Sequence, residues 1–130
     1  MYYRNTDGIR ITVTPRFSPE HSDVAEPRFV FVYHIRIENT SSGTVQLRWR
    51  HWYIHDELAG DSEVEGEGVI GEQPVLAPCQ SYEYTSGTPL PTPSGIMVGS
   101  YDMELPDGEC FAVAVPAFSL DSPHQPRRLN

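Results

Sequence analysis

The sequence predicts an all-β protein, an antiparallel β-sandwich of about seven strands. Apolar and polar residues alternate with a period of two along most of the chain, as they do in half-buried strands. No stretch has the 3.6-residue period of a long amphipathic helix, and 10 Gly and 12 Pro separate the short apolar runs. Without helices to cross over a sheet, neighbouring strands are expected to be antiparallel.

The chain length agrees with one domain. A chain of 130 residues can bury ~68% of its unfolded surface around a single core. We expect the core of this single domain, 1–130, to span about residues 9–120, and the polar stretch 121–130 to be a loose C-terminal tail.

The predicted strands follow in order. Ile9, Ile11, Val13 and Phe17 share one face of the first strand, and residues 29–37 form the second. In the third strand the inner face carries Val45, Leu47 and Trp49, and the run 50–54 is ambiguous and open to a bulge. Later strands cover the half-polar run 62–65, 82–84, 97–105 and 111–115.

Turn residues divide these strands. Pro106-Asp107-Gly108 predicts a hairpin turn, because Gly adopts the positive φ that closes it. Pro116 is expected to end the last strand, and residues 85–89 are interpreted as a turn.

Composition excludes several classes of partner. The net charge is -9 and all nine Lys+Arg residues are Arg, which disfavours nucleic acid and anionic membrane surfaces. No window reaches the ~20 apolar residues of a membrane span, and the N-terminus lacks a secretion signal. We therefore expect a cytoplasmic protein. Cys79 and Cys110 are expected to be reduced, packed thiols, with one disulfide as the alternative.

The motif GEGVIG, with Gly66, Gly68 and Gly71, matches the GxGxxG pattern of dinucleotide-binding proteins. A dinucleotide fold requires a helix after it, and Pro74 disfavours one. Two interpretations remain: an anion nest of backbone amides, or glycines that allow positive φ and close backbone approach. Nearby glutamates would repel a phosphate unless a divalent cation such as Mg²⁺ lay between the carboxylates and the phosphate. These glutamates are Glu63, Glu65, Glu67 and Glu72.

Acidic residues near two histidines are the candidate metal ligands. His51 and His55 would lie about 13 Å apart on a strand, which argues against a zinc pair. A solvated acidic surface is preferred, and a loose Mg²⁺ site is the alternative; the acidic residues are Asp56, Glu57, Asp61, Glu63 and Glu65.

No combination of nucleophile, base and oxyanion donor is visible, so no catalytic residue is predicted. Arg48, Arg50 and Trp52 would share one face of a regular strand. Such residues are common anchors of protein contacts. The alternative is a covered sheet face with the Arg stems folded over it.

Several motifs in register resemble the ApaG family over about residues 9–120. They are GEGVIGEQP at 66–74, YHIRIEN at 33–39, RHW at 50–52, YTSG at 84–87, TPSGIM at 92–97, GSYDM at 99–103 and FAVAVPAF at 111–118. One departure is Pro78-Cys79, where the family usually has Pro-Gly. A turn of the glycine type is therefore in doubt at this position, and Cys79 is expected at the surface if the turn is exposed.

The resemblance implies a fibronectin type III-like or immunoglobulin-like sandwich. It also links the chain to tolerance of cobalt and magnesium ions (the family is also called CorD), and to eukaryotic domains that resemble protein-binding modules. The family's glycine motif, here Gly66, Gly68 and Gly71, has been proposed as a pyrophosphate or nucleotide contact. No catalytic residue is carried over.

We therefore expect a non-enzymatic binding module for an unidentified protein partner. The alternatives are a nucleotide or pyrophosphate site at residues 66–71, with Mg²⁺ or Co²⁺ as its companion ion, and an enzyme acting on nucleoside polyphosphates. A homodimer through edge strands is a further alternative.

Overall fold

The computed structural model describes residues 1–23, 25, 28–56 and 58–123, and within them the chain forms nine strands and one turn of 3-10 helix. The all-β prediction is confirmed. The strands are β1 (Tyr2–Thr6), β2 (Ile9–Phe17), β3 (Phe29–Asn39), β4 (Val45–Asp56), β5 (Gly60–Glu67), β6 (Val75–Leu76), β7 (Ser81–Leu90), β8 (Ser94–Glu104) and β9 (Cys110–Asp121), and the 3-10 turn is η1 (Pro19–His21). The two strands missed by the prediction are β1, which has no buried face, and β6, which is two residues long.

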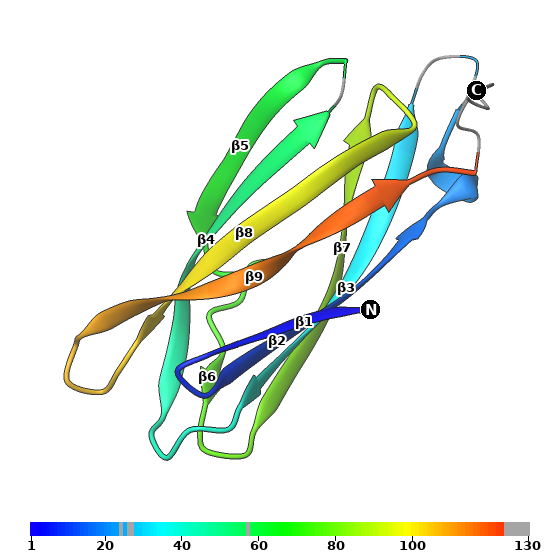
Figure 1. The fold of residues 1–130 in the computed structure, drawn as a ribbon. Coiled ribbons are helices and arrows are strands. Elements are labelled where there is room, and N and C mark those ends of the chain that lie inside the picture. Colours follow the sequence, from blue (N-terminus) through cyan, green and yellow to red (C-terminus); the bar gives the residue numbers. More distant parts are fainter. Residues whose placement is uncertain (24, 26–27, 57, 124–130) are drawn as a thin grey trace.

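The strands form two sheets that pack face to face (Figure 1). One has the order β1-β2-β3-β7, and the other has the order β5-β4-β8-β9, with β6 paired to β4. Every strand pair is antiparallel. The chain is therefore a β-sandwich, as the alternation predicted.

The core lies between the sheets and follows the predicted inner faces. Ile9, Ile11 and Val13 of β2 are fully buried, and so are Tyr101 and Met103 of β8. These side chains alternate with exposed or half-buried ones, which is the pattern expected when one face of each sheet meets the other sheet.

A bulge in β4 changes which residues face the core. Leu47 pairs with Met103, but Trp49 already pairs with Asp102, so Arg48 is the extra residue. Leu47 is 1% exposed and Trp49 is 36% exposed, whereas Trp52 is 3% exposed. The prediction that Trp49 shares the inner face with Leu47 is therefore wrong, because the inner face changes from odd to even positions at Arg48.

Two predicted breaks lie inside strands. Pro116 does not end β9, which continues past a register shift where Val115 pairs with Gly99 and Phe118 with Met97. Residues 85–89 are not a turn but lie within β7. Both β7 and β9 are edge strands, and an edge strand tolerates a proline because one side of its backbone needs no ladder partner.

The ends of β8 and β9 are ordered. Gly108 has φ 91° in the turn between them, and the Leu105 N–H donates to the Glu109 carbonyl at 2.8 Å, which confirms the hairpin. Asp121 ends β9, and the buried Ser122 donates its N–H to the Pro93 carbonyl, so these residues are not a loose tail. The rest of the predicted tail, 124–130, lies outside the described residues. In the part of the chain that the structure describes, no helix could span a membrane.

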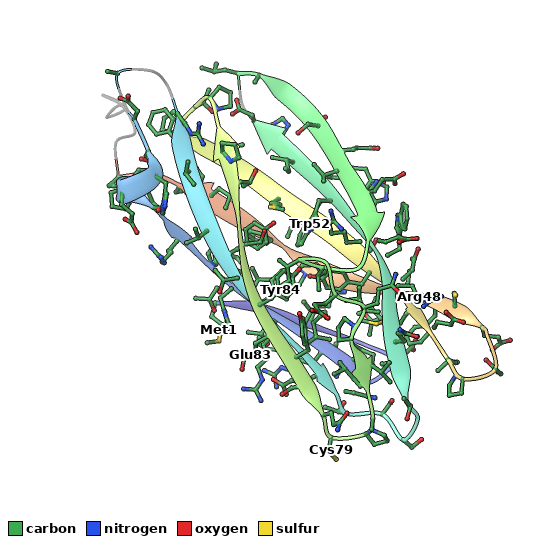
Figure 2. All side chains as sticks on the ribbon, turned by 180° about the vertical axis from the view of Figure 1, so that it is seen from behind. Met1, Arg48, Trp52, Cys79, Glu83 and Tyr84 are labelled. Carbon is green, nitrogen blue, oxygen red and sulfur yellow. The ribbon has the colours of Figure 1, made fainter. Side chains whose placement is uncertain are left out.

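Both cysteines are free, as predicted, and both are exposed. The predicted packing of these thiols is therefore wrong, whereas the surface position expected for Cys79 from its departure from the family pattern is confirmed. Cys79 lies at the turn before β7 (Figure 2) and has φ 69°. This is the left-handed region in which a side chain is strained. The turn thus keeps the glycine-type conformation although the residue is cysteine.

Replacing Cys79 by glycine is expected to raise the free energy of unfolding by about 0.5–1 kcal/mol, because glycine removes the left-handed strain but adds entropy to the unfolded chain. Urea denaturation at constant m-value measures this. Cys79→Ser, which keeps a Cβ, is the matched control and should gain nothing. Equal stability of the two variants would contradict the expected strain.

Candidate functional site

The glycine motif forms the end of β5 and a tight turn after it. Gly66 lies in β5, and no helix follows Gly71. Instead Val69 and Glu72 form an isolated antiparallel bridge, in which each N–H donates to the other's carbonyl at 2.8 Å. The Gly68 N–H donates to the Arg48 carbonyl at 2.9 Å. Three amides of this segment are therefore engaged in backbone hydrogen bonds.

Each motif glycine has a different local environment. A Cβ on Gly66 would lie 3.1 Å from both terminal nitrogens of Arg50, and a Cβ on Gly68 would lie 2.2 Å from the Glu72 carbonyl oxygen. Gly68 has φ +62° and Gly71 has φ +79°, and nothing lies within 4 Å of a Cβ placed on Gly71. Space for Arg50 and positive φ thus account for all three glycines in the fold.

Arg50 connects β4 to this glycine segment. Its Nη1 donates to the carbonyl oxygens of Glu67 and Gly68, at 2.9 and 3.0 Å. Arg50 reaches this segment because it follows the bulge and pairs with Gly66 across β4 and β5. The glycines and Arg50, predicted as parts of two separate sites, are therefore in contact.

Arg48 does not share a surface with Arg50 and Trp52, whose side chains lie on the same side of β4 and line one cavity between the sheets. Arg48, at the bulge, is exposed and forms an ion pair with Glu104, with its Nε 2.8 Å from a carboxylate oxygen. Trp52 lies between the sheets (Figure 2), with its ring centroid 5.6 Å from that of Tyr33 and 6.1 Å from that of Phe118. The prediction of one exposed patch is therefore wrong for Trp52, because the bulge turns it into the core.

A cavity of about 250 Å³ lies beside Arg50, between β4, β5 and β8 of one sheet and β3 and β7 of the other. We call it the inter-sheet cleft. Its polar lining is Tyr33, Arg50, Tyr84, Ser86 and Thr88, and its apolar lining includes Trp52, Ile54, Val64, Val69, Ile70 and Met97.

The tyrosines at the cleft are kept neutral. Burial raises the pKa of Tyr84, and its hydroxyl lies 2.5 Å from that of Tyr101, whose pKa burial also raises. Burial likewise raises the pKa of Tyr33, while a hydrogen bond with Ser86 and the positive charge of Arg50 oppose the shift. At neutral pH these hydroxyls donate and accept hydrogen bonds but carry no charge.

The outward side of the β5-β4-β8-β9 sheet carries a second group of side chains, which we call the outer face. Cross-strand pairing aligns Tyr53 of β4 with Val98 of β8, and His55 with Ile96. Tyr53 is 45% exposed, Ile96 48% and Val98 38%, and all three line a groove of about 570 Å³. On the other side of β4, its pairing with β5 adds a row of carboxylates to this face: Asp61, Glu63, Glu65 and Glu67.

The two histidines of the outer face contact different carboxylates. His51 Nε2 lies 3.6 Å from an oxygen of Glu63 and 3.6 Å from one of Glu65, and His55 contacts Asp61. Among the described residues, no group of three or more His, Cys, Asp or Glu side chains is arranged to hold a metal ion.

Asp56 differs from the solvated acid that the sequence predicted. It is 3% exposed and accepts hydrogen bonds from the N–H groups of Leu58 and Ala59 and from the Thr92 hydroxyl. Burial alone would raise the pKa of Asp56, but these hydrogen bonds outweigh it and lower the pKa. Its role is to join the β4–β5 connection to the β7–β8 connection. Glu57 lies outside the described residues.

Comparison with known proteins agrees with this fold. The sequence model of the ApaG domain family matches residues 19–105. Protein ApaG of Paramagnetospirillum magneticum is 56% identical over 130 residues, and that of Rhodospirillum centenum is 57% identical over 130 residues, in both cases across 100% of each chain. A crystal structure of a Bordetella pertussis protein described as ApaA superposes with a TM-score of 0.85 at 44% identity, covering 95% of this chain and 97% of that one.

These matches define the class of protein as a β-sandwich of the ApaG type. The chain belongs to the ApaG family.

Proposed function

We propose that the protein is a non-enzymatic binding module and that its outer face docks a protein partner bearing Lys or Arg side chains. The observation that supports this is the combination of exposed Tyr53, Ile96 and Val98 with the carboxylate row of β5. Aromatic and aliphatic anchors surrounded by charged residues are typical of protein interfaces.

Charge supports a basic partner. Four carboxylates point to the same side of β5, and the whole chain carries a net charge of -9. Such a field accelerates association with a positively charged surface and repels acidic ones. The aromatic ring of Tyr53 could also accept a cation over its face.

The nucleotide alternative at Gly66, Gly68 and Gly71 has less support. The N–H groups of Gly68, Val69 and Glu72 are already bonded within the segment. A bound phosphate would need to displace these bonds or use other amides close to Glu67 and Glu72. The resemblance to the ApaG family also links the chain to tolerance of cobalt and magnesium ions. Partner binding is therefore measured with and without each ion.

The test compares two lysine substitutions on opposite sheets. Ile96→Lys places a positive charge on the outer face, beside His55, and Thr85→Lys places the same side chain on the exposed outer side of β7. The immobilised wild-type protein and both variants are used to capture partners from lysate, and the affinity for each purified partner is then measured.

We expect a partner whose affinity falls at least tenfold with Ile96→Lys, is unchanged with Thr85→Lys, and declines with salt. Equal loss with both variants, or loss only with Thr85→Lys, would contradict the docking surface. Self-association detected by light scattering, abolished by Ile96→Lys, would instead identify a second copy of the chain as the occupant.

A further inference from the structure

We propose that the inter-sheet cleft binds a small organic carboxylate with an apolar body, whose carboxylate pairs with the guanidinium of Arg50. This site is separate from the outer face, which is turned to the opposite side of the β5-β4-β8-β9 sheet. The two proposals therefore stand or fall independently.

The first step is the unbalanced charge of Arg50. Arg50 is half-buried and lines the cleft. Within the described residues it forms no ion pair, whereas Arg16, Arg36 and Arg48 each pair with a glutamate. A charge that is partly removed from water is unfavourable unless an opposite charge compensates it. An anion in the cleft would supply that compensation.

The second step concerns the donors that remain. Only Nη1 of Arg50 has hydrogen-bond partners among the described residues, the carbonyls of Glu67 and Gly68. These two bonds hold the guanidinium in place and leave the N–H groups of Nε and Nη2 available to a ligand. Nε and Nη2 form the fork that binds a carboxylate through two parallel hydrogen bonds. The hydroxyl of Thr88 lines the same cleft as an additional donor.

The third step concerns the size and polarity of the ligand. A cavity of about 250 Å³ is slightly smaller than the usual ligand site, which suits a single ring or a short aliphatic chain. Trp52, Ile54 and Met97 provide an apolar wall for such a body. One arginine balances a single negative charge. A polyphosphate brings several negative charges, which a single arginine does not balance, and is therefore disfavoured in the cleft.

The experiment is an amide NMR titration of the full chain with benzoate and with hexanoate. We expect saturable shifts at Gly66, Gly68, Ser86 and Gly87, with a dissociation constant of about 0.1–1 mM for such small ligands. Arg50→Gln removes the charge and should weaken binding at least tenfold. Arg48→Gln is the matched control, two residues away on the same strand and exposed, and should bind as the wild type does.

A second variant keeps the test decisive if Arg50→Gln disturbs the glycine segment. Val64 lines the cleft from β5 and is 45% exposed, so Val64→Trp should fill the cleft without removing Arg50 and should also abolish the shifts. Three results would overturn the proposal. They are no saturable shift up to ~10 mM carboxylate, equal effects of Arg48→Gln and Arg50→Gln, and pyrophosphate or ATP binding these same residues more tightly than either carboxylate.

Discussion

Replacing Trp52 by alanine is expected to lower the free energy of unfolding by about 3–5 kcal/mol. The indole is 3% exposed and packs against the rings of Tyr33, Tyr101 and Phe118 from both sheets. Its removal would leave a cavity in a core that cannot fully collapse, so the lost transfer free energy and the cavity would both contribute.

Trp49 is the matched control for this prediction, because it belongs to the same strand and is 36% exposed. Trp49→Ala should lower the free energy of unfolding by less than about 1 kcal/mol. Urea denaturation followed by circular dichroism measures both values and does not depend on tryptophan fluorescence. Similar losses in the two variants would show that the bulge at Arg48 does not divide the strand as described.

Replacing Gly68 by alanine is expected to lower the free energy of unfolding by about 3 kcal/mol, because left-handed strain and a backbone clash add together. Gly68 has φ +62°, and a Cβ there would lie 2.2 Å from the carbonyl oxygen of Glu72. This oxygen accepts the hydrogen bond that closes the turn, so it cannot move without breaking that bond.

Gly71→Ala provides the comparison, since Gly71 has φ +79° but nothing within 4 Å of an added Cβ. Its expected loss is about 1 kcal/mol, the cost of the left-handed conformation alone. Chemical denaturation of the two variants checks the difference, and a Gly68→Ala loss no larger than that of Gly71→Ala would refute the steric argument. Loss of nucleotide binding in Gly68→Ala would therefore not identify a phosphate site, and Gly71→Ala is the better variant for that question.

The alternation of apolar residues was sufficient to predict the two-layer fold and most of its inner faces. Ile9, Ile11 and Val13 face the core as expected, since each strand has one face to bury. The sequence left the run 50–54 open to a bulge, but the position of the bulge at Arg48 could not be predicted, because it depends on how β4 pairs with β8. One extra residue there exchanges the environments of Trp49 and Trp52. The predicted partner surface therefore loses Trp52, which is buried in the core.

Proline predicted the ends of strands less well than expected, for a physical reason. Pro116 and Pro89 lie within strands because β9 and β7 are at the edges of their sheets, a position that no local pattern reveals. The carboxylate row of β5 was within reach of sequence reasoning, since Asp61, Glu63, Glu65 and Glu67 alternate. Its position beside Tyr53 and Val98 was not, because it results from pairing between distant segments.

The most direct test of the proposed docking surface is site-specific photo-cross-linking with benzoylphenylalanine in place of Tyr53. This residue is similar to tyrosine in shape, and position 53 is exposed at the centre of the outer face. The same group at Thr85 reports on the opposite sheet. We predict a cross-link from position 53 to a basic protein partner and none to that partner from position 85. A partner that cross-links from position 85 and not from position 53 would contradict the account.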